Sequence, residues 1–209
     1  MNNTNSQIRR DPITLLFNPF FYLAGAEALV IGLAGILIAG WIGALGHTHF
    51  DGVLDTHTGA HAPLAVFLAE GIIDWLCLAL VLLVFGKIIS KTAFRPIDLI
   101  ATQALARWPT ILIGLVCLLP ALQRFSRVII EQVTKPGSKV DFYTSDAIIF
   151  FAAIAAMIPL LCWLIALMYK SYSVSCNVKG GKAIGTFIAG LILAEILSKI
   201  AIYHLPGLG

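Results

Sequence analysis

The chain has 209 residues, of which 59% are hydrophobic and 12% charged, and its formal net charge at pH 7 is +3. An ordinary soluble domain has about 25% charged residues, so this composition favours a membrane protein. The few basic residues are dispersed along the chain, which argues against a nucleic-acid partner. The four cysteines have no close pair spacing, so neither a disulfide framework nor a thiolate metal site is expected.

Five apolar stretches, each long enough to cross about 30 Å of hydrocarbon as a helix, predict an all-α polytopic fold. We expect one membrane domain over residues 1–209, with residues 1–20 forming a short cytoplasmic tail. The apolar run that follows this tail is too long for a removable signal peptide. The predicted spans are residues 21–46, 63–86, 97–122, 147–169 and 183–203.

The first span carries small residues at helical spacing, Gly35, Ala39 and Gly43. Such a face lets another helix approach closely. It therefore predicts a helix contact, either inside the bundle or between two copies in a homo-oligomer.

The loop after the first span holds four of the five histidines of the chain and no Lys or Arg, so we expect it on the outside of the membrane. Imidazoles and carboxylates together suit Zn²⁺ or another divalent cation, although the spacing matches no established zinc motif. The alternatives are a plain polar connector and a pH sensor. The candidate metal ligands are His47, His49, Asp51, Asp55, His57 and His61.

The third apolar stretch is interrupted by Arg107 and Pro109. Because proline removes a helical hydrogen bond, we expect either a span kinked at Pro109 or a re-entrant segment. Residues 98–106 also fit a partly amphipathic helix at the cytoplasmic interface that turns inward at Pro109, with Trp108 as an interfacial anchor, which would make Arg107 shallow. The distribution of basic residues between the loops does not choose between these topologies.

Ionisable side chains inside the spans form a second candidate site, because charges in the bilayer tend to be paired or to face a bundle interior. From the helical rise, Asp74 and Arg107 fall near the midplane and can pair. Glu195 and Lys199 are four residues apart, which suits an ordinary ion pair. The set is either a static clamp between helices or a polar path for protons or ions, and comprises Glu70, Asp74, Arg107 and Glu195.

Four segments resemble bacterial proteins that carry the Yip domain, named for Ypt/Rab-interacting proteins. They are residues 16–20, the break at 107–109, and residues 168–183 running into 190–199. The resemblance implies a five-helix integral protein of the bacterial inner membrane with a cytoplasmic amino terminus. Eukaryotic members bind small GTPases through a cytoplasmic region, but the tail here is too short for a comparable docking domain.

The functional prediction is a non-enzymatic membrane scaffold that contacts a second copy or another membrane protein. No complete phosphate-binding loop, catalytic triad or metalloprotease helix is present to suggest an enzyme. The alternative is a transporter or metal-handling protein, in which the His/Asp loop captures a divalent cation and Glu70, Asp74 and Arg107 lie along its path.

Overall fold

A computed structural model describes residues 11–59, 61–135 and 143–205, and in these residues the fold is all-α, as predicted. The only strands there are β1 and β2, two residues each. The elements are α1 (Pro12–Phe17), the 3-10 helix η1 (Pro19–Phe21), α2 (Gly25–Gly46), β1 (Thr48–His49), β2 (His57–Thr58), α3 (Leu64–Ile89), α4 (Pro96–Ala106), α5 (Pro109–Cys117), α6 (Pro120–Thr134), α7 (Thr144–Ser175) and α8 (Gly180–Tyr203).

Five helical segments are long and apolar enough to cross a membrane, which confirms the prediction of five spans. They are α2, α3, the pair α4 and α5 in series, α7 and α8. The predicted third span, residues 97–122, extended too far, because Pro120 begins α6. A multi-pass membrane protein is therefore the class of the molecule.

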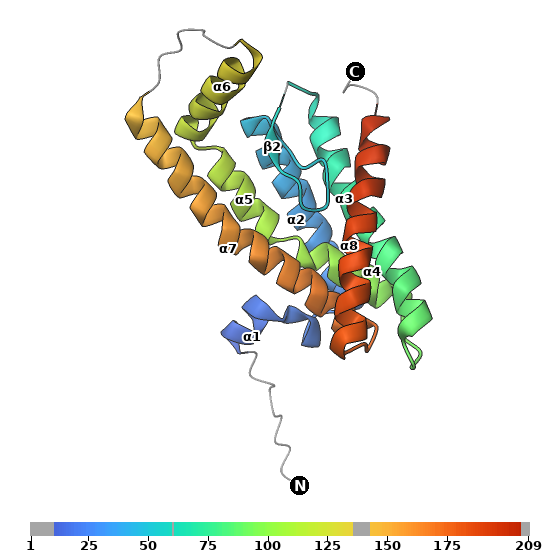
Figure 1. The fold of residues 1–209 in the computed structure, drawn as a ribbon. Coiled ribbons are helices and arrows are strands. Elements are labelled where there is room, and N and C mark those ends of the chain that lie inside the picture. Colours follow the sequence, from blue (N-terminus) through green and yellow to red (C-terminus); the bar gives the residue numbers. More distant parts are fainter. Residues whose placement is uncertain (1–10, 60, 136–142, 206–209) are drawn as a thin grey trace.

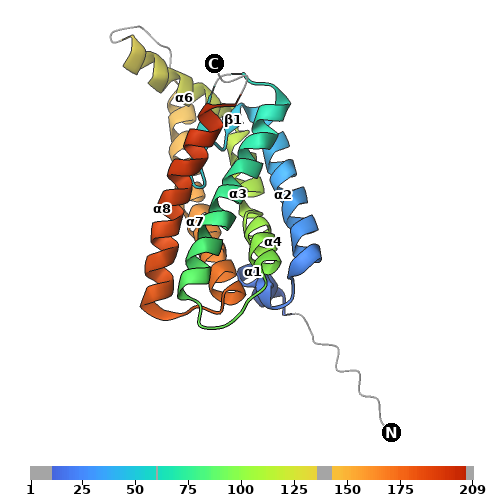
Figure 2. The same ribbon diagram turned by 90° about the vertical axis from the view of Figure 1, so that its right-hand side faces the viewer.

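The bundle has two distinct ends (Figures 1 and 2). One end carries α1 and the turns at residues 90–95 and 176–179, and we call it the tail face. The other end carries the strands β1 and β2, helix α6 and the end of α8, and we call it the hairpin face. Because the number of spans is odd, the first and last helices of the chain, α1 and the end of α8, lie at opposite ends of the bundle.

The third span is kinked and central. Helix α4 ends at Ala106 and α5 begins at Pro109, whose missing N–H suits the first turn of a helix. Both helices pack along α2, and α4 also contacts α3 and α7. A Cβ on Gly32 of α2 would lie 2.4 Å from the backbone nitrogen of Leu105, so glycine permits this close approach. The packing of α4 and α5 in series along α2 favours the kinked span over the re-entrant and interfacial alternatives.

The small-residue face of α2 is used within the protomer. Gly35, Ala39 and Gly43 are all buried. A Cβ on Gly43 would lie 2.6 Å from the carbonyl oxygen of Thr48, in the loop that follows the helix. This face is covered by the chain itself, so it does not provide a contact with a second copy.

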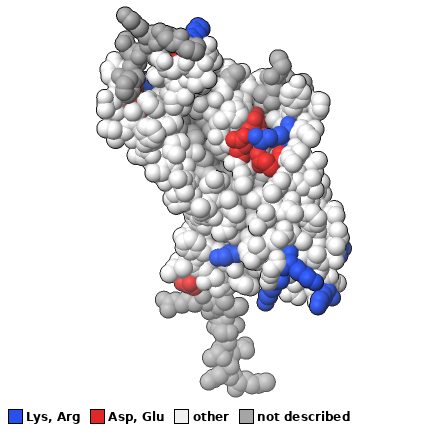
Figure 3. Space-filling model, in the orientation of Figure 1, with Lys and Arg blue, Asp and Glu red and all other residues white. Residues whose placement is uncertain are grey.

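Helix α7 is the least covered of the spans. In its most apolar window 11% of the residues are buried, against 67% in the segment that joins α4 and α5. Tyr172 of α7 contacts Thr186 of α8 through their hydroxyls, 3.1 Å apart, near the tail face. From there α7 and α8 diverge toward the hairpin face (Figure 1), where the surface is hollowed between them (Figure 3).

Candidate functional site

The loop between α2 and α3 is folded inward at the hairpin face. Its strands pair antiparallel, with His49 opposite His57. The apolar side chains of Phe50 and Val53 are buried, so the tip enters the bundle. The sequence predicted only on which side of the membrane this loop lies, and not that its tip enters the bundle. The loop lies among the helices because the burial of Phe50 and Val53 away from water lowers the free energy of the folded chain.

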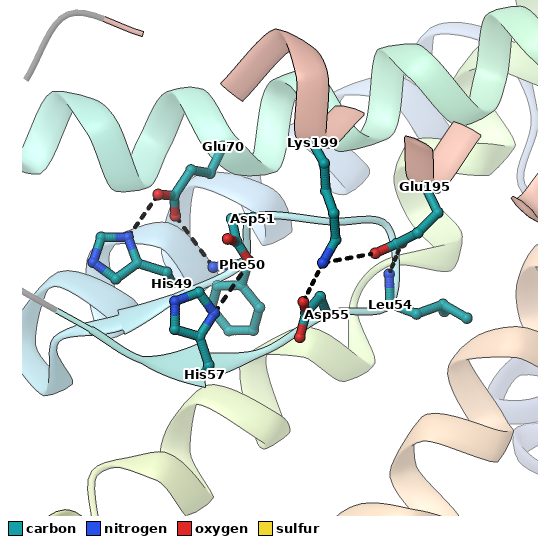
Figure 4. Close-up of polar contacts among 9 residues, drawn as sticks. All are labelled: His49, Phe50, Asp51, Leu54, Asp55, His57, Glu70, Glu195 and Lys199. Carbon is teal, nitrogen blue, oxygen red and sulfur yellow. Dashed lines mark hydrogen bonds and ion pairs between the residues drawn. The ribbon is translucent and has the colours of Figure 1, made fainter. Parts of the chain in front are cut away.

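Glu70 of α3 anchors the first half of the loop (Figure 4). One carboxylate oxygen lies 2.6 Å from Nδ1 of His49, and the other accepts a hydrogen bond of 3.1 Å from the backbone N–H of Phe50. All three residues are buried. Sequence reasoning placed Glu70 in the membrane cluster and His49 among the metal ligands, and did not pair them.

Two side chains of α8 anchor the tip of the loop. Glu195 accepts a hydrogen bond of 3.0 Å from the backbone N–H of Leu54, and its other oxygen lies 3.6 Å from Nζ of Lys199. The predicted Glu195 to Lys199 ion pair is thus confirmed, and Lys199 also pairs with Asp55. Because Glu195 lies about 12 Å along the helix axis from the end of α8 at Tyr203, the tip reaches well into the bundle.

Three of the six predicted metal ligands converge at this tip. One ligand atom from each of Asp51, Asp55 and His57 lies within 4.8 Å of the others. The contact with His57, at 3.2 Å, holds the pKa of Asp51 below its usual range, and the same contact raises the pKa of His57. Two carboxylates and an imidazole could hold a divalent cation if Lys199 released Asp55.

The other three predicted ligands lie elsewhere. His49 faces Glu70 and stacks on Phe67, with ring centroids 4.5 Å apart. The rings of His47 and His61 lie 3.8 Å apart, and burial together with these neighbouring histidines lowers the pKa of His47. The six residues therefore do not form a single metal site.

His47 and His61 line a cavity of about 580 Å³ between the loop and α6. Its wall includes basic and polar groups from both elements, and no acidic side chain belongs to its described lining. The lining residues are Gly46, His47, Thr58, Gly59, His61, Gln123, Arg127 and Ile130.

The predicted pair of Asp74 and Arg107 is confirmed at the kink of the third span. Nη2 of Arg107 donates to Oδ2 of Asp74 at 3.2 Å, and both side chains are buried. Trp108 packs edge-on against Trp163 of α7, with centroids 4.4 Å apart, so it is a bundle contact rather than an interfacial anchor. Arg107 is therefore buried inside the bundle, in contact with the partner that the sequence predicted.

A neutral polar cluster, missed by the sequence analysis, continues from Arg107 toward the tail face. The hydroxyl of Thr102 lies 2.8 Å from that of Ser171 and 2.9 Å from that of Ser175. Gln103 donates to the carbonyl oxygen of Met168 at 2.9 Å. Helical spacing could have predicted part of this cluster, because Gln103 lies one helical turn before Arg107 and therefore on the same face of the third span.

Three neighbouring residues of the interior keep a buried polar atom without a hydrogen-bond partner in the described part of the chain. The atoms are Oδ1 of Asp74, Nη1 of Arg107 and Oε1 of Gln103. Buried polar groups are normally satisfied, and water or an ion is a common partner for such atoms. The middle of the bundle therefore has capacity for further polar contacts.

Comparison with known protein families, with curated proteins and with solved structures finds no match for the chain. The functional argument consequently depends on the geometry described above.

Proposed function

We propose that the chain is a Yip-like, non-enzymatic scaffold of the bacterial inner membrane, with its amino terminus in the cytoplasm. The orientation is supported by the basic residues of the tail face, because cytoplasmic loops are enriched in Lys and Arg. Those in the described part are Lys87, Lys91, Arg95, Lys170, Lys179 and Lys182, against Arg124, Arg127, Lys135 and Lys199 toward the hairpin face.

One observation carries the scaffold assignment: the charged groups of the interior hold elements of the fold together. Glu70 and Glu195 bind backbone N–H groups of the inserted loop, and Asp74 joins Arg107 across two helices. Such contacts are clamps, which tie the loop and the third span to neighbouring helices. Helix α7 meanwhile leaves a long apolar surface for neighbours in the bilayer.

Cross-linking at Cys162 tests the scaffold assignment. This cysteine is exposed on α7, whereas Cys117 and Cys176 are buried and Cys77 is partly buried. A bis-maleimide applied to native membranes is expected to join Cys162 to a neighbouring protein or a second copy. The adduct should disappear in Cys162→Ser and persist in Cys77→Ser. A chain that stays unlinked in membranes and monomeric in detergent would contradict the proposal.

Divalent-cation handling is the second candidate, and the convergence of Asp51, Asp55 and His57 favours it. Further into the bundle from this cluster, the next carboxylate is Glu195. The buried Asp74 follows, and its surroundings include Glu195 and Ser198 of α8. Carboxylates thus continue from the loop tip to the kink of the third span. This arrangement suits the capture of a cation followed by its passage inward.

Zn²⁺ titration of the detergent-purified chain tests the second candidate. We expect one equivalent to bind and the affinity to fall at least about tenfold in Asp51→Asn, because a carboxylate ligand is lost. His61→Gln is the matched control, since it removes a histidine of the same loop that lies outside the cluster. Binding that is unchanged in Asp51→Asn, or lost equally in His61→Gln, would contradict a site at the loop tip.

Uptake of Zn²⁺ into proteoliposomes extends this test to the interior. If the cation passes the kink, Asp74→Asn should abolish uptake while leaving Zn²⁺ binding at the loop intact. Equal uptake by the parent chain and Asp74→Asn would show that the cluster binds without transport.

A further inference from the structure

The cavity between α6 and the loop has a chemistry that neither proposed function uses. Three groups of its lining carry or can accept positive charge, Arg127, His47 and His61, and its described lining has no carboxylate to balance them. Neutral imidazoles still donate one N–H each, and Thr58 adds a hydroxyl. The cavity is therefore rich in donors and poor in negative charge, which suits an anion.

The two arginines of α6 have different roles. Arg124 holds Asp146 of α7 through two hydrogen bonds of 2.7 Å, so its charge is already neutralised. Arg127, one turn further along α6, lines the cavity and makes no ion pair with any residue that the structure describes. Its guanidinium is free to take a ligand, and guanidinium groups bind phosphate with two parallel hydrogen bonds.

The wall that carries Arg127 is fixed in place. Gln123 donates a hydrogen bond of 3.1 Å to the carbonyl oxygen of Gly46 at the end of α2. On the opposite wall the backbone N–H of Gly59 donates to the carbonyl oxygen of His47 at 2.9 Å. Both sides of the cavity are thus held by the fold, so little ordering is needed when a ligand binds.

The position of α6 indicates which anion is available. The helix lies at the hairpin face, away from the centre of the bundle (Figure 2). Its basic residues lie beside exposed apolar ones, Ile129 and Val133, the second with 74% of its surface exposed. An amphipathic helix of this kind lies in the headgroup layer, where lipid phosphates are the most abundant anions.

We infer that the cavity between α6 and the loop binds a phosphate group through Arg127, His47 and His61. The phosphate comes either from a lipid headgroup at the hairpin face or from free phosphate in the adjoining solution. The volume of about 580 Å³ is in the range of small-molecule sites and admits a phosphoglycerol headgroup.

Native mass spectrometry of the full-length chain in maltoside detergent tests this inference. The probes are dioleoylphosphatidylglycerol and dioleoylglycerol, which share their acyl chains and differ in the phosphate-bearing headgroup. We expect phosphatidylglycerol to bind at least about tenfold more tightly than dioleoylglycerol, because only phosphatidylglycerol can make a charge-assisted hydrogen bond to Arg127. Equal binding of the two lipids would overturn the inference, since the acyl chains alone would then explain it.

Competition with inorganic phosphate separates the two sources. Binding of inorganic phosphate alone, together with displacement of phosphatidylglycerol, identifies free phosphate as a ligand. Retention of phosphatidylglycerol in millimolar phosphate identifies the lipid headgroup. Both results support a phosphate site, and failure to bind either probe would overturn it.

Matched variants locate the site. Arg127→Gln is expected to weaken phosphatidylglycerol binding about tenfold, whereas Lys135→Gln, at the end of the same helix and outside the cavity, should change it less than about twofold. Because Arg127 is exposed, the thermal midpoint of the unliganded variant should match the parent. Equal affinities of Arg127→Gln and Lys135→Gln would overturn the assignment to this cavity. His61→Gln should weaken phosphatidylglycerol while sparing Zn²⁺, which separates this site from the loop tip.

Discussion

The two halves of the bundle are held together by different chemistry. Toward the tail face the contacts between spans are neutral, with Thr102 between Ser171 and Ser175, and Gln103 on a backbone carbonyl. Toward the hairpin face the contacts are charged: Asp74 of α3 pairs with Arg107 of the third span, and Glu70 and Glu195 hold the inserted loop. Both halves lie within the five helical segments that are long and apolar enough to cross a membrane, so apolar surroundings alone do not explain the difference.

The inserted loop explains where the charges lie. Near the tail face the helices touch, and their backbone groups are satisfied within each helix. Toward the hairpin face α7 and α8 diverge, and a loop whose backbone N–H groups lack helical partners fills part of the interior. Glu70 and Glu195 accept from the N–H groups of Phe50 and Leu54. Intramembrane carboxylates thus substitute for the hydrogen bonds that a helix would make.

The largest expected effect comes from breaking the buried charge pair. Arg107→Ala leaves Asp74 buried without its cation and should cost about 3 to 5 kcal/mol of stability. The measurement is reversible unfolding in mixed micelles. The double variant Asp74→Leu with Arg107→Met should recover much of the loss, because it removes both charges. A double variant as unstable as Arg107→Ala would contradict a role limited to mutual neutralisation.

Removing the anchor of the loop should have the next largest effect. Glu70→Ala leaves the buried N–H of Phe50 unpaired, at a cost of about 1 to 3 kcal/mol, and should release the loop. In a Val53→Cys background, a membrane-impermeant maleimide should then label residue 53 faster. Glu27→Ala removes an exposed carboxylate from α2 and should leave labelling slow. Equal labelling in both variants would show that Glu70 does not hold the loop.

A neutral contact of the tail half should matter less. Thr102→Val keeps the shape of the side chain but removes the hydroxyl that links Ser171 and Ser175, with an expected loss of about 1 kcal/mol. Thr134→Val, on the exposed surface of α6, is the control and should change stability by less than about 0.5 kcal/mol. A loss from Thr102→Val as large as that from Arg107→Ala would remove the distinction between the halves.

The smallest effect concerns pH at the loop tip. Asp51 raises the pKa of His57 above its ordinary value near 6.5, so the charged pair stabilises the folded chain below that pH. This contribution should be lost as the pH rises through the raised pKa, and solvent screening keeps it small because His57 is half exposed. The thermal midpoint should therefore fall slightly more between about pH 6 and pH 9 in the parent chain than in His57→Gln.

Local patterns in the sequence were enough to predict the spans and two of the ion pairs. Hydropathy locates the five spans, helical rise brings Asp74 level with Arg107, and a spacing of four joins Glu195 to Lys199. Each of these inferences depends only on positions along regular helices.

The path of the loop was beyond such reasoning. Whether residues 47–62 stay in water or enter the bundle depends on the space that α7 and α8 leave between them, which no local pattern encodes. For the same reason the partner of Glu70 was missed, and the candidate metal ligands divided into three groups. The sequence also did not show whether the small-residue face of α2 contacts the same chain or a second copy, because that depends on tertiary packing.

The divergence of α7 and α8 has a further consequence, which concerns the thickness of the bilayer. On α7, Asp146 and Lys170 bracket an apolar length of about 36 Å, whereas Lys182 and Glu195 bracket about 20 Å on α8. In about 30 Å of hydrocarbon the longer helix must tilt by roughly 30°, and the shorter one remains upright. Hydrophobic mismatch between neighbours therefore opens the hollow beside the loop tip. A thicker membrane should draw α7 upright and narrow that hollow.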